Sequence, residues 1–554
     1  MSRPSALAAA AGRFVDLDGT PFTLPGSRLL VRRDAATGLC VLRAGYEVAP
    51  ADSVLLAGLR VLAPTGQELP VTHLEVDRLE FGGGVASLTF AGDDALSVGG
   101  AEVSVTARLV DGAPVSATAS EAEGVLITAP DPAEGPVAVT RGGHHARALA
   151  ATRRRWLDWF ARCPRVGAEL QPIVAHCWWV LGANTVELRS VPGSRAVVPA
   201  KLGYLGLWQW DAYFIAIGLR HGDLDLAAEQ FELALRFARA DGQLPDVVHD
   251  TGVLAGSEDL PPGDLARLRE LGSPAARPGV RVPLTKPPLA ALALARLAES
   301  GLPSDRLEAL VPVIEASQHW WLTACLALDG LPEYTHPYSS GLDDSPVFDA
   351  DLPVATPDLA AYLELQDRQL EELYRRLGRD AEAGRSHRRA GESGQRLLRL
   401  WDADASRFRC RGRNGPIAAH TVLDLLPLIT GTLPGEIASA LVADLDDPET
   451  FASRFPVPSV AAADPSFDPE RMWRGPVWLN MNWLLVEGLL RHGRAERARA
   501  LARDTLRMVA TAGGAFEYYG PESGRRAGSA VSCFGWTAAL IIDLAVRFGS
   551  AAEA

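Results

Sequence analysis

The chain has 554 residues, of which 47% are hydrophobic and 22% charged, a composition typical of globular proteins and not of disordered or fibrous ones. Its 54 Lys and Arg residues are outnumbered by 68 Asp and Glu residues, so the formal net charge is −14. Because an acidic surface repels phosphate backbones, nucleic acid is excluded as an expected partner.

The N-terminal segment Met1–Gly12 contains an alanine run but lacks the apolar stretch of a secretory signal. No run of about 18 apolar residues follows, so we expect no membrane contact and a cytoplasmic location. The six cysteines are scattered without metal-ligand spacing, and neither common glycine-rich nucleotide motif occurs. These patterns predict reduced thiols, no metal and no organic cofactor.

Short segments with alternating apolar residues fill the region before Trp156, and glycine-containing turns such as Gly82–Gly84 separate them. The segments are Arg28–Arg32, His73–Phe81, Val85–Phe90, Glu102–Leu109 and Val125–Thr128. Alternation with a period of two predicts strands that bury one face. We therefore expect an all-β, sandwich-like N-terminal domain over residues 1–142, which ends in a connector that includes Ala129–Pro136.

The pattern changes to helical spacing from about His145, and all thirteen tryptophans lie at or after Trp156. Helical stripes run through Val166–Leu181, Leu224–Ala238, Leu289–Leu297, Ile314–Leu326, Leu359–Leu377 and Pro476–Leu490. They predict a mainly α domain over residues 143–554 with about a dozen helices. Periodicity alone does not distinguish a toroid from an irregular bundle.

Loop-rich clusters in this region combine aromatic rings with carboxylates. They are Tyr204–Phe214, Glu333–Pro346, Arg471–Trp483 and Phe516–Trp536. Sugars stack their C–H faces on aromatic rings, and their hydroxyl groups need polar partners. The clusters therefore predict a carbohydrate site.

Individual residues in these clusters allow two interpretations each. Asp343 with Asp344 could supply a general acid or could form an N-cap or Asx-turn pair before a proline. Glu517 could be a positioned base or a structural residue. Asp211 could bind hydroxyl groups or cap a helix, and Arg474 could orient a carboxylate or brace a helix start.

Other chemistries find no support in the sequence. His249 and His336 have no Ser or Cys nucleophile motif nearby, so a nucleophilic triad is not expected. The arginine runs Arg153–Arg155 and Arg388–Arg389 are typical of solvated helix faces.

Seven motifs, in this order and spacing, resemble glycoside hydrolase family 63. The resemblance is to its bacterial branch, which contains mannosylglycerate hydrolases, glucosylglycerate hydrolases and bacterial α-glucosidases. The motifs are Trp210–Phe214, Gly242–Pro245, Thr285–Pro288, Ser340–Pro346, Trp473–Trp478, Phe516–Tyr519 and Phe534–Thr537.

The resemblance implies an (α/α)6 toroid and hydrolysis by a single displacement that inverts the anomeric carbon. It assigns Asp343 as the acid and Glu517 as the base, which must stand about 6.5–9.5 Å apart to admit a water molecule. The substrate-binding candidates taken from the matching motifs are Trp208, Trp210, Asp211, Phe214, Gln243, Lys286, Gly341, Asp344, Trp473, Arg474, Tyr518 and Trp536.

Two residues depart from the family pattern. Lys286 occupies a position that is commonly Gln, and Asp344 occupies one that is often Asn. Each adds a charge near the expected site, and Lys286 would suit an anionic aglycone such as glycerate. The extra β-domain instead favours an enzyme of the α-glucosidase or debranching type.

We therefore expect an inverting hydrolase of α-glucosides or α-mannosides, with a small carbohydrate as its partner and a monomer or homodimer as its assembly. A glycoside phosphorylase on the same scaffold is a second interpretation, although Glu517 argues against it. A carbohydrate-binding protein without turnover is a third interpretation.

Overall fold

A computed structural model describes residues 2–131, 133–260, 263, 266, 268, 281–349 and 352–549. It divides into two compact units. The first comprises Met1–Gly206, Gly513–Ala515 and Ser532–Ala538, and the second comprises Leu207–Ala512, Phe516–Val531 and Ala539–Ala554.

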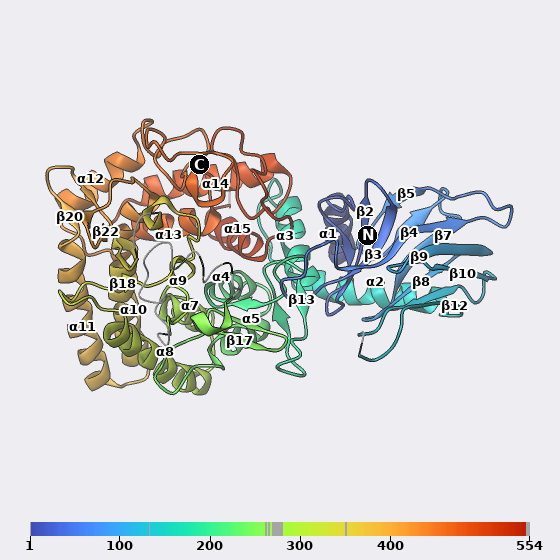
Figure 1. The fold of residues 1–554 in the computed structure, drawn as a ribbon, viewed down its shortest axis with the longest axis horizontal. Helices are drawn as coiled ribbons and strands as arrows, with labels where there is room; N and C mark the ends of the chain where they lie inside the picture. Colours follow the sequence, from blue (N-terminus) through green and yellow to red (C-terminus); the bar gives the residue numbers. More distant parts are fainter. Residues whose placement is uncertain are drawn as a thin grey trace. The chain divides into compact units, whose positions relative to one another are not determined.

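The first unit contains two antiparallel sheets of six strands each (Figure 1). One has the order β1 (Phe22–Thr23), β2 (Leu29–Asp34), β3 (Gly38–Arg43), β4 (Val54–Leu62), β9 (Val103–Leu109) and β10 (Pro114–Ala119). The other has the order β12 (Ala138–Arg141), β11 (Val125–Thr128), β8 (Ala95–Gly99), β7 (Ala86–Gly92), β6 (Leu79–Phe81) and β5 (Val71–Leu74).

Alternate side chains of these strands form the core of the first unit. In β9, Val103 and Val105 are buried while Ser104 between them is partly exposed, and Val125 and Ile127 of β11 repeat the pattern. The predicted β-sheet N-terminal region is thus confirmed, but it is not all-β, because residues Arg3–Gly12 form a helix. The predicted strand His73–Phe81 is in fact two strands, β5 and β6, which pair with each other.

The first unit also holds helices α1 (Arg3–Gly12), α2 (His145–Ala161) and α3 (Gln171–Ala183), and the short pair β13 (Thr185–Val186) and β14 (Ala196–Val197). Trp159 of α2 and Trp178 of α3 stack with centroids 4.9 Å apart, and each indole N–H donates to the other residue's carbonyl. Helix α2 begins at His145, where the helical pattern begins in the sequence. The predicted domain boundary at residues 142 and 143 stays a prediction.

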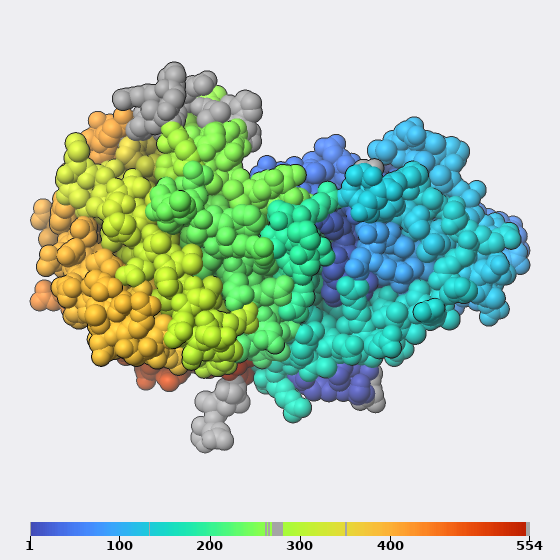
Figure 2. Space-filling view, turned by 90° about the horizontal axis from the view of Figure 1, so that it is seen from below, coloured from blue at the N-terminus to red at the C-terminus, as the bar shows by residue number. Residues whose placement is uncertain are grey.

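Buried helices alternate with amphipathic helices in the rest of the chain. The helices are α4 (Gln209–Leu219), α5 (Leu224–Leu235), α7 (Ala290–Glu299), α8 (Ser304–Ala324), α10 (Pro357–Arg376), α11 (Asp380–Leu398), α12 (Gly435–Leu445), α13 (Leu479–Arg491), α14 (Ala495–Ala512) and α15 (Gly535–Phe548). Every residue of α4 is buried, whereas α11 buries one stripe only and contributes to the orange surface in Figure 2. This arrangement confirms the expected (α/α)6 toroid.

Short elements connect these helices. They are β15 (Leu207–Trp208), β16 (Val247–His249), β17 (Gly252–Leu254), β18 (Glu333–Tyr334), β19 (Val354–Ala355), β20 (Trp401–Asp402), β21 (Arg407–Phe408), β22 (Arg411–Gly412), β23 (Gly415–Pro416), α9 (Pro337–Ser340) and the 3-10 turns η1 (Ser257–Asp259), η3 (Pro346–Phe348), η4 (Val422–Asp424), η5 (Leu426–Thr430) and η6 (Met472–Arg474). Among the described residues, no helix combines the length and apolarity needed to cross a membrane.

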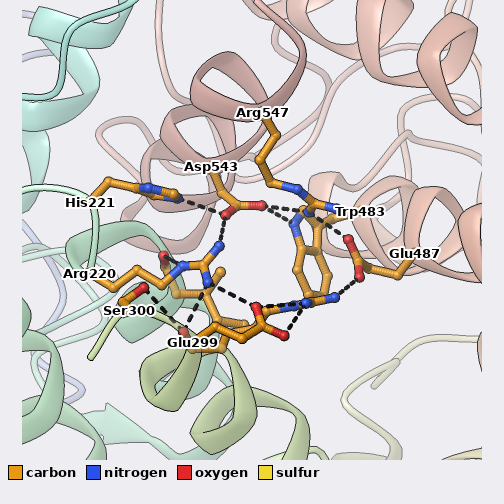
Figure 3. Close-up of polar contacts among 10 residues, drawn as sticks. Arg220, His221, Glu299, Ser300, Trp483, Glu487, Asp543 and Arg547 are labelled. Carbon is orange, nitrogen blue, oxygen red and sulfur yellow. Dashed lines mark hydrogen bonds and ion pairs between the residues drawn. The ribbon is translucent and has the colours of Figure 1, made fainter. Parts of the chain in front are cut away.

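A buried charge network joins the ends of α4, α7, α13 and α15 (Figure 3). The Asp543 carboxylate accepts hydrogen bonds from Arg220 at 2.6 Å and from the indole N–H of Trp483 at 2.8 Å. Arg547 bridges Asp543 and Glu487, which also pairs with Arg296. Because each carboxylate is paired, these charges are tolerated within the helical core.

Candidate active site

The proposed acid Asp343 follows the single turn of α9. The hydroxyl group of Ser340 accepts a hydrogen bond from the backbone N–H of Leu342 at 3.0 Å and donates one to the carbonyl of Pro337 at 2.7 Å. Gly341 has φ +73°, and a Cβ atom there would lie 2.2 Å from the Trp210 ring. The loop therefore needs glycine at this position, both for its backbone conformation and for contact with Trp210.

The proposed base Glu517 lies in the loop of residues 516–531. Its backbone N–H donates to the carbonyl of Val531 at 2.8 Å, and its Oε2 accepts the N–H of Val531 at 3.0 Å. The next residues are also anchored, because Tyr518 hydrogen-bonds Ser529 and Tyr519 pairs with Val477. Glu517 is 5% exposed, so backbone contacts fix a nearly buried carboxylate.

A cluster of buried charges lies near both proposed catalytic residues. Burial raises the pKa of Asp211 well above its ordinary value, Lys286 opposes this shift, and Asp246 and Glu517 add to it. Lys286 in turn interacts with Asp246, Asp343 and Asp211. Two predicted site residues, Asp211 and Lys286, thus lie within electrostatic range of Glu517 and Asp343 respectively.

Asp211 lies in the first turn of α4, but it is not the N-cap, which is Trp208. The residue is 4% exposed. The capping interpretation of Asp211 is therefore wrong. Similarly, the residue before the 3-10 turn η3 is Ser345, so neither Asp343 nor Asp344 caps it.

Four aromatic side chains form a series of ring contacts beside this cluster. Trp473 stacks on Trp478 with centroids 3.6 Å apart and an interplanar angle of 6°. Trp210 contacts Trp473 at 6.5 Å, and Trp478 contacts Tyr518 at 4.8 Å. We call these four residues the aromatic row. Rings of this kind can stack on the C–H face of a sugar.

The remaining aromatic candidates have separate surroundings. Trp208 belongs to β15, which pairs with β16. Phe214 is buried between Trp210 and Trp483, at centroid distances of 5.9 and 6.1 Å. Trp536 belongs to the first unit, where its ring lies 5.0 Å from that of Phe534.

Both the amide NH2 and the amide oxygen of Gln243 form hydrogen bonds within the protein. Its amide NH2 donates to the carbonyls of Ala255 and Leu284, at 2.7 and 2.9 Å, and its oxygen accepts from Arg281 at 3.0 Å. These bonds connect the segment after α5 to the segment before Lys286. Gln243 thus organises neighbouring loops, and its direct contact with a sugar stays a prediction.

Two arginines hold the acid-bearing loop through bidentate ion pairs. Arg471 donates to Asp344 from Nε and Nη2 at 2.7 and 2.8 Å, and Arg474 grips both oxygens of Asp349. Arg474 also lies 3.5 Å from Asp344. We call these four residues the arginine clasp. Arg474 does orient a carboxylate, as one interpretation of the sequence proposed, and that carboxylate belongs to Asp349.

Several residues around the site were not among the predicted candidates. They are Asp246, Tyr338, Asp349, Arg471 and Trp478. Trp478 lies inside a quoted motif and Arg471 opens a quoted cluster, so proximity in sequence could have marked both. Asp246 and Asp349 reach the site through contacts between distant segments. Among the described residues, no group of three His, Cys, Asp or Glu side chains could hold a metal ion.

The family described as the mannosylglycerate hydrolase MGH1-like glycoside hydrolase domain matches residues 204–537. Mannosylglycerate hydrolase MGH1 of Selaginella moellendorffii is 29% identical over 412 residues, which cover 62% of this chain and 81% of that protein. Mannosylglycerate hydrolase of Thermus thermophilus is 30% identical over 410 residues, which cover 62% of this chain and 95% of that protein.

A solved structure agrees with these sequence matches. The crystal structure of the family 63 mannosylglycerate hydrolase from Thermus thermophilus in complex with glucose has a TM-score of 0.55 and 28% identity. The match covers 67% of this chain and 99% of that one. The residues that match the family include both Asp343 and Glu517.

Proposed function

This chain belongs to glycoside hydrolase family 63, and on that premise we propose that it hydrolyses an α-glucoside or α-mannoside with inversion at the anomeric carbon. The observation that carries the proposal is that side-chain contacts bring the motifs of Asp343, Asp211 and Glu517 together. Gly341, two residues before Asp343, lies against the Trp210 ring, and the ring contacts continue from Trp210 to Tyr518, the neighbour of Glu517. The cluster of buried charges lies beside this aromatic row, which is suited to a sugar ring.

Two proton transfers complete the proposed reaction. The carboxyl group of Asp343 gives its proton to the glycosidic oxygen while the bond from that oxygen to the anomeric carbon breaks. A water molecule forms the new bond from the opposite face, and Glu517 accepts its proton. The products are a free aglycone and a sugar of inverted configuration. The hydrogen bond from Val531 to Oε2 of Glu517 supports this role because it fixes the orientation of the base.

Glycerate glycosides are the first substrates to test, because the relatives described above are mannosylglycerate hydrolases. The β-domain, however, lies outside the residues that match the family, and it favours a substrate of the α-glucosidase type. We therefore propose a panel that contains both classes, with glucose and mannose as the sugars.

The decisive experiment is a proton NMR time course of the anomeric signals with this panel. Release of a β-sugar from an α-glycoside supports inversion and identifies the substrate. Initial release of the α-sugar contradicts the single displacement assigned to Asp343 and Glu517. No release from any member of the panel contradicts the proposed substrate class.

A further inference from the structure

Lysine is rare in this chain, and its two lysine residues are both buried. The sequence contains 54 Lys and Arg residues, but the lysines are Lys201 and Lys286 alone. They are 3% and 5% exposed. Lysine is seldom buried unless it is paired, because removing an ammonium group from water is costly. Arginine therefore supplies the exposed cations of this protein, and lysine occupies two interior positions.

Lys286 has specific partners on segments that are distant in sequence. Its Nζ lies 2.9 Å from Oδ1 of Asp246, which is 1% exposed, and donates to the carbonyl of Tyr338 at 2.7 Å. Its backbone N–H donates to the side-chain oxygen of Gln209 at 3.3 Å. The backbone N–H of Thr285 reaches the hydroxyl group of Ser339 at 3.4 Å.

These contacts attach the Lys286 segment to the turn that precedes the proposed acid. Tyr338 and Ser339 belong to α9, which ends at Ser340, three residues before Asp343. Asp246 precedes β16, and its carbonyl accepts the N–H of Gln209, the first residue of α4. Lys286 thus lies where the segments that carry Asp211 and Asp343 meet.

The ammonium group faces several carboxylates. Burial alone would lower the pKa of Lys286, but Asp246, Asp343 and Asp211 together raise it. Asp211 also faces Glu517. The ring of Tyr338 lies 5.8 Å from Nζ, where a cation–π interaction adds to the stabilisation of the charge.

We propose that Lys286 is a positioning residue, which forms a buried ion pair with Asp246, anchors the acid-bearing turn at Tyr338 and balances the charge of the surrounding carboxylates. This inference rests on the proposed function, because it takes Asp343 as the acid. It differs from the expectation that Lys286 receives an anionic aglycone. Two of its three N–H donors already serve Asp246 and the carbonyl of Tyr338.

The charge balance predicts a change in pH dependence. Without the ammonium group, Asp343 loses a nearby cation that favours its ionised form, so it keeps its proton to higher pH. An acid must be protonated to act. When the cation alone is removed, the basic limb of the profile of kcat/KM against pH therefore moves to higher pH. Removing both charges of the Lys286–Asp246 pair leaves the local net charge unchanged. The basic limb then returns to its wild-type pH.

The first test is independent of activity and uses the two lysines. With [6-13C]lysine, the protein gives two side-chain signals, and K286Q identifies the signal of Lys286. We expect Lys286 to lose its proton about one pH unit or more lower in D246N than in the wild type. Lys201 is the internal control, because its ammonium group donates to the hydroxyl group of Thr23 and the carbonyl of Leu24. Equal titration of Lys286 in both proteins would overturn the ion pair.

The second test compares K286Q, D246N and the double variant D246N/K286Q on the substrate found for the wild type. In K286Q we expect kcat to fall about tenfold to a hundredfold and the basic limb to rise by about one pH unit. In the double variant, whose two amides can hydrogen-bond each other, we expect the limb to return to its wild-type position.

A purely structural role predicts lower thermal stability with an unchanged basic limb, and this result contradicts the proposal. A rise in KM that is confined to glycerate glycosides also contradicts it, because Lys286 would then bind the aglycone. If the wild type hydrolyses no glycoside, the proposed function is wrong. The lysine titration still tests whether Lys286 forms an ion pair with Asp246.

Discussion

Asp343 and Glu517 both lie in loops outside the regular helices. The backbone N–H of Val531 holds the Glu517 carboxylate, and the hydroxyl group of Ser340 holds the turn that precedes Asp343. Loops on a rigid scaffold commonly carry catalytic groups. The single-displacement mechanism gives the two carboxylates different tasks, because one donates a proton while the other accepts one. Amide variants separate these tasks from binding, since an amide keeps the shape of the side chain.

We expect D343N and E517Q each to lower kcat by about 10²–10⁴-fold, the usual contribution of a general acid or base. Stabilisation by bound sugar in a thermal unfolding assay should persist, because binding to the folded state does not require turnover. E522Q is the matched control, because Glu522 is an exposed residue of the same loop as Glu517. Full activity in both D343N and E517Q would contradict the assignment.

Gly341 supports the proposed site by having no side chain. A Cβ atom would overlap the ring of Trp210, with the nearest ring atom at 2.2 Å. We expect G341A to lose about 1–3 kcal/mol of stability beyond the cost of the positive φ, together with activity, because Trp210 must move. G378A is the control, since Gly378 has φ +69° and open space around it. Equal melting temperatures for the two variants would show that Trp210 imposes no constraint.

The arginine clasp joins two elements, the turn of residues 468–475 and the loop that carries Asp343. The Arg471 side chain is 52% exposed, so its ion pair with Asp344 is worth less than about 1 kcal/mol in stability. The ion pair instead positions the loop, because a bidentate pair with Asp344 holds the neighbouring Asp343 in a defined place.

We expect R471Q to leave the melting temperature nearly unchanged and to lower kcat/KM about tenfold or more, because small displacements of a catalytic group are costly. Salt should reproduce part of this loss in the wild type, since a Debye length of about 3 Å at 1 M screens exposed pairs. R499Q on α14 serves as a control at an exposed arginine. A loss of activity as large in R499Q would contradict the specific role of Arg471.

The charge network of Figure 3 acts at the scale of the helical region, because it connects four helices that are far apart in sequence. Burial alone would raise the pKa of Asp543, but the hydrogen bond from His221 and the charges of Arg547 and Arg220 hold it well below its usual range. Asp543 therefore remains ionised inside the core throughout the working range of pH.

We expect D543N to lower the stability at pH 7 by about 3 kcal/mol, because it leaves buried arginines without their counter-charge. The folded pKa of Asp543 is depressed, so its contribution is present above the unfolded pKa of about 4 and is lost at lower pH. The difference in melting temperature between wild type and D543N should shrink as the pH falls from 7 toward 3. D504N, at an exposed pair on α14, should change little at any pH.

The sequence predicted the parts of the fold that depend on local pattern. Alternation identified the β-region and helical spacing identified most of the helices, because both patterns record which faces are buried. Helix α1 was missed, because an alanine run carries little periodicity, although Leu7 and Ala11 are buried. The family and its glycoside hydrolase activity were also predicted, from seven short motifs, and the comparisons confirm them.

The pairing of charges was decided by the tertiary structure alone. Lys286 and Asp344 were visible in the sequence as departures from a family pattern, but their partners were not. Lys286 pairs with Asp246 across 40 positions, and Asp344 with Arg471 across 127. Local periodicity reports burial within one element, whereas the sign and strength of an ion pair depend on which distant segments the fold brings together. The segments that carry the candidate residues could thus be marked from the sequence, while the ion pairs among them required the folded chain.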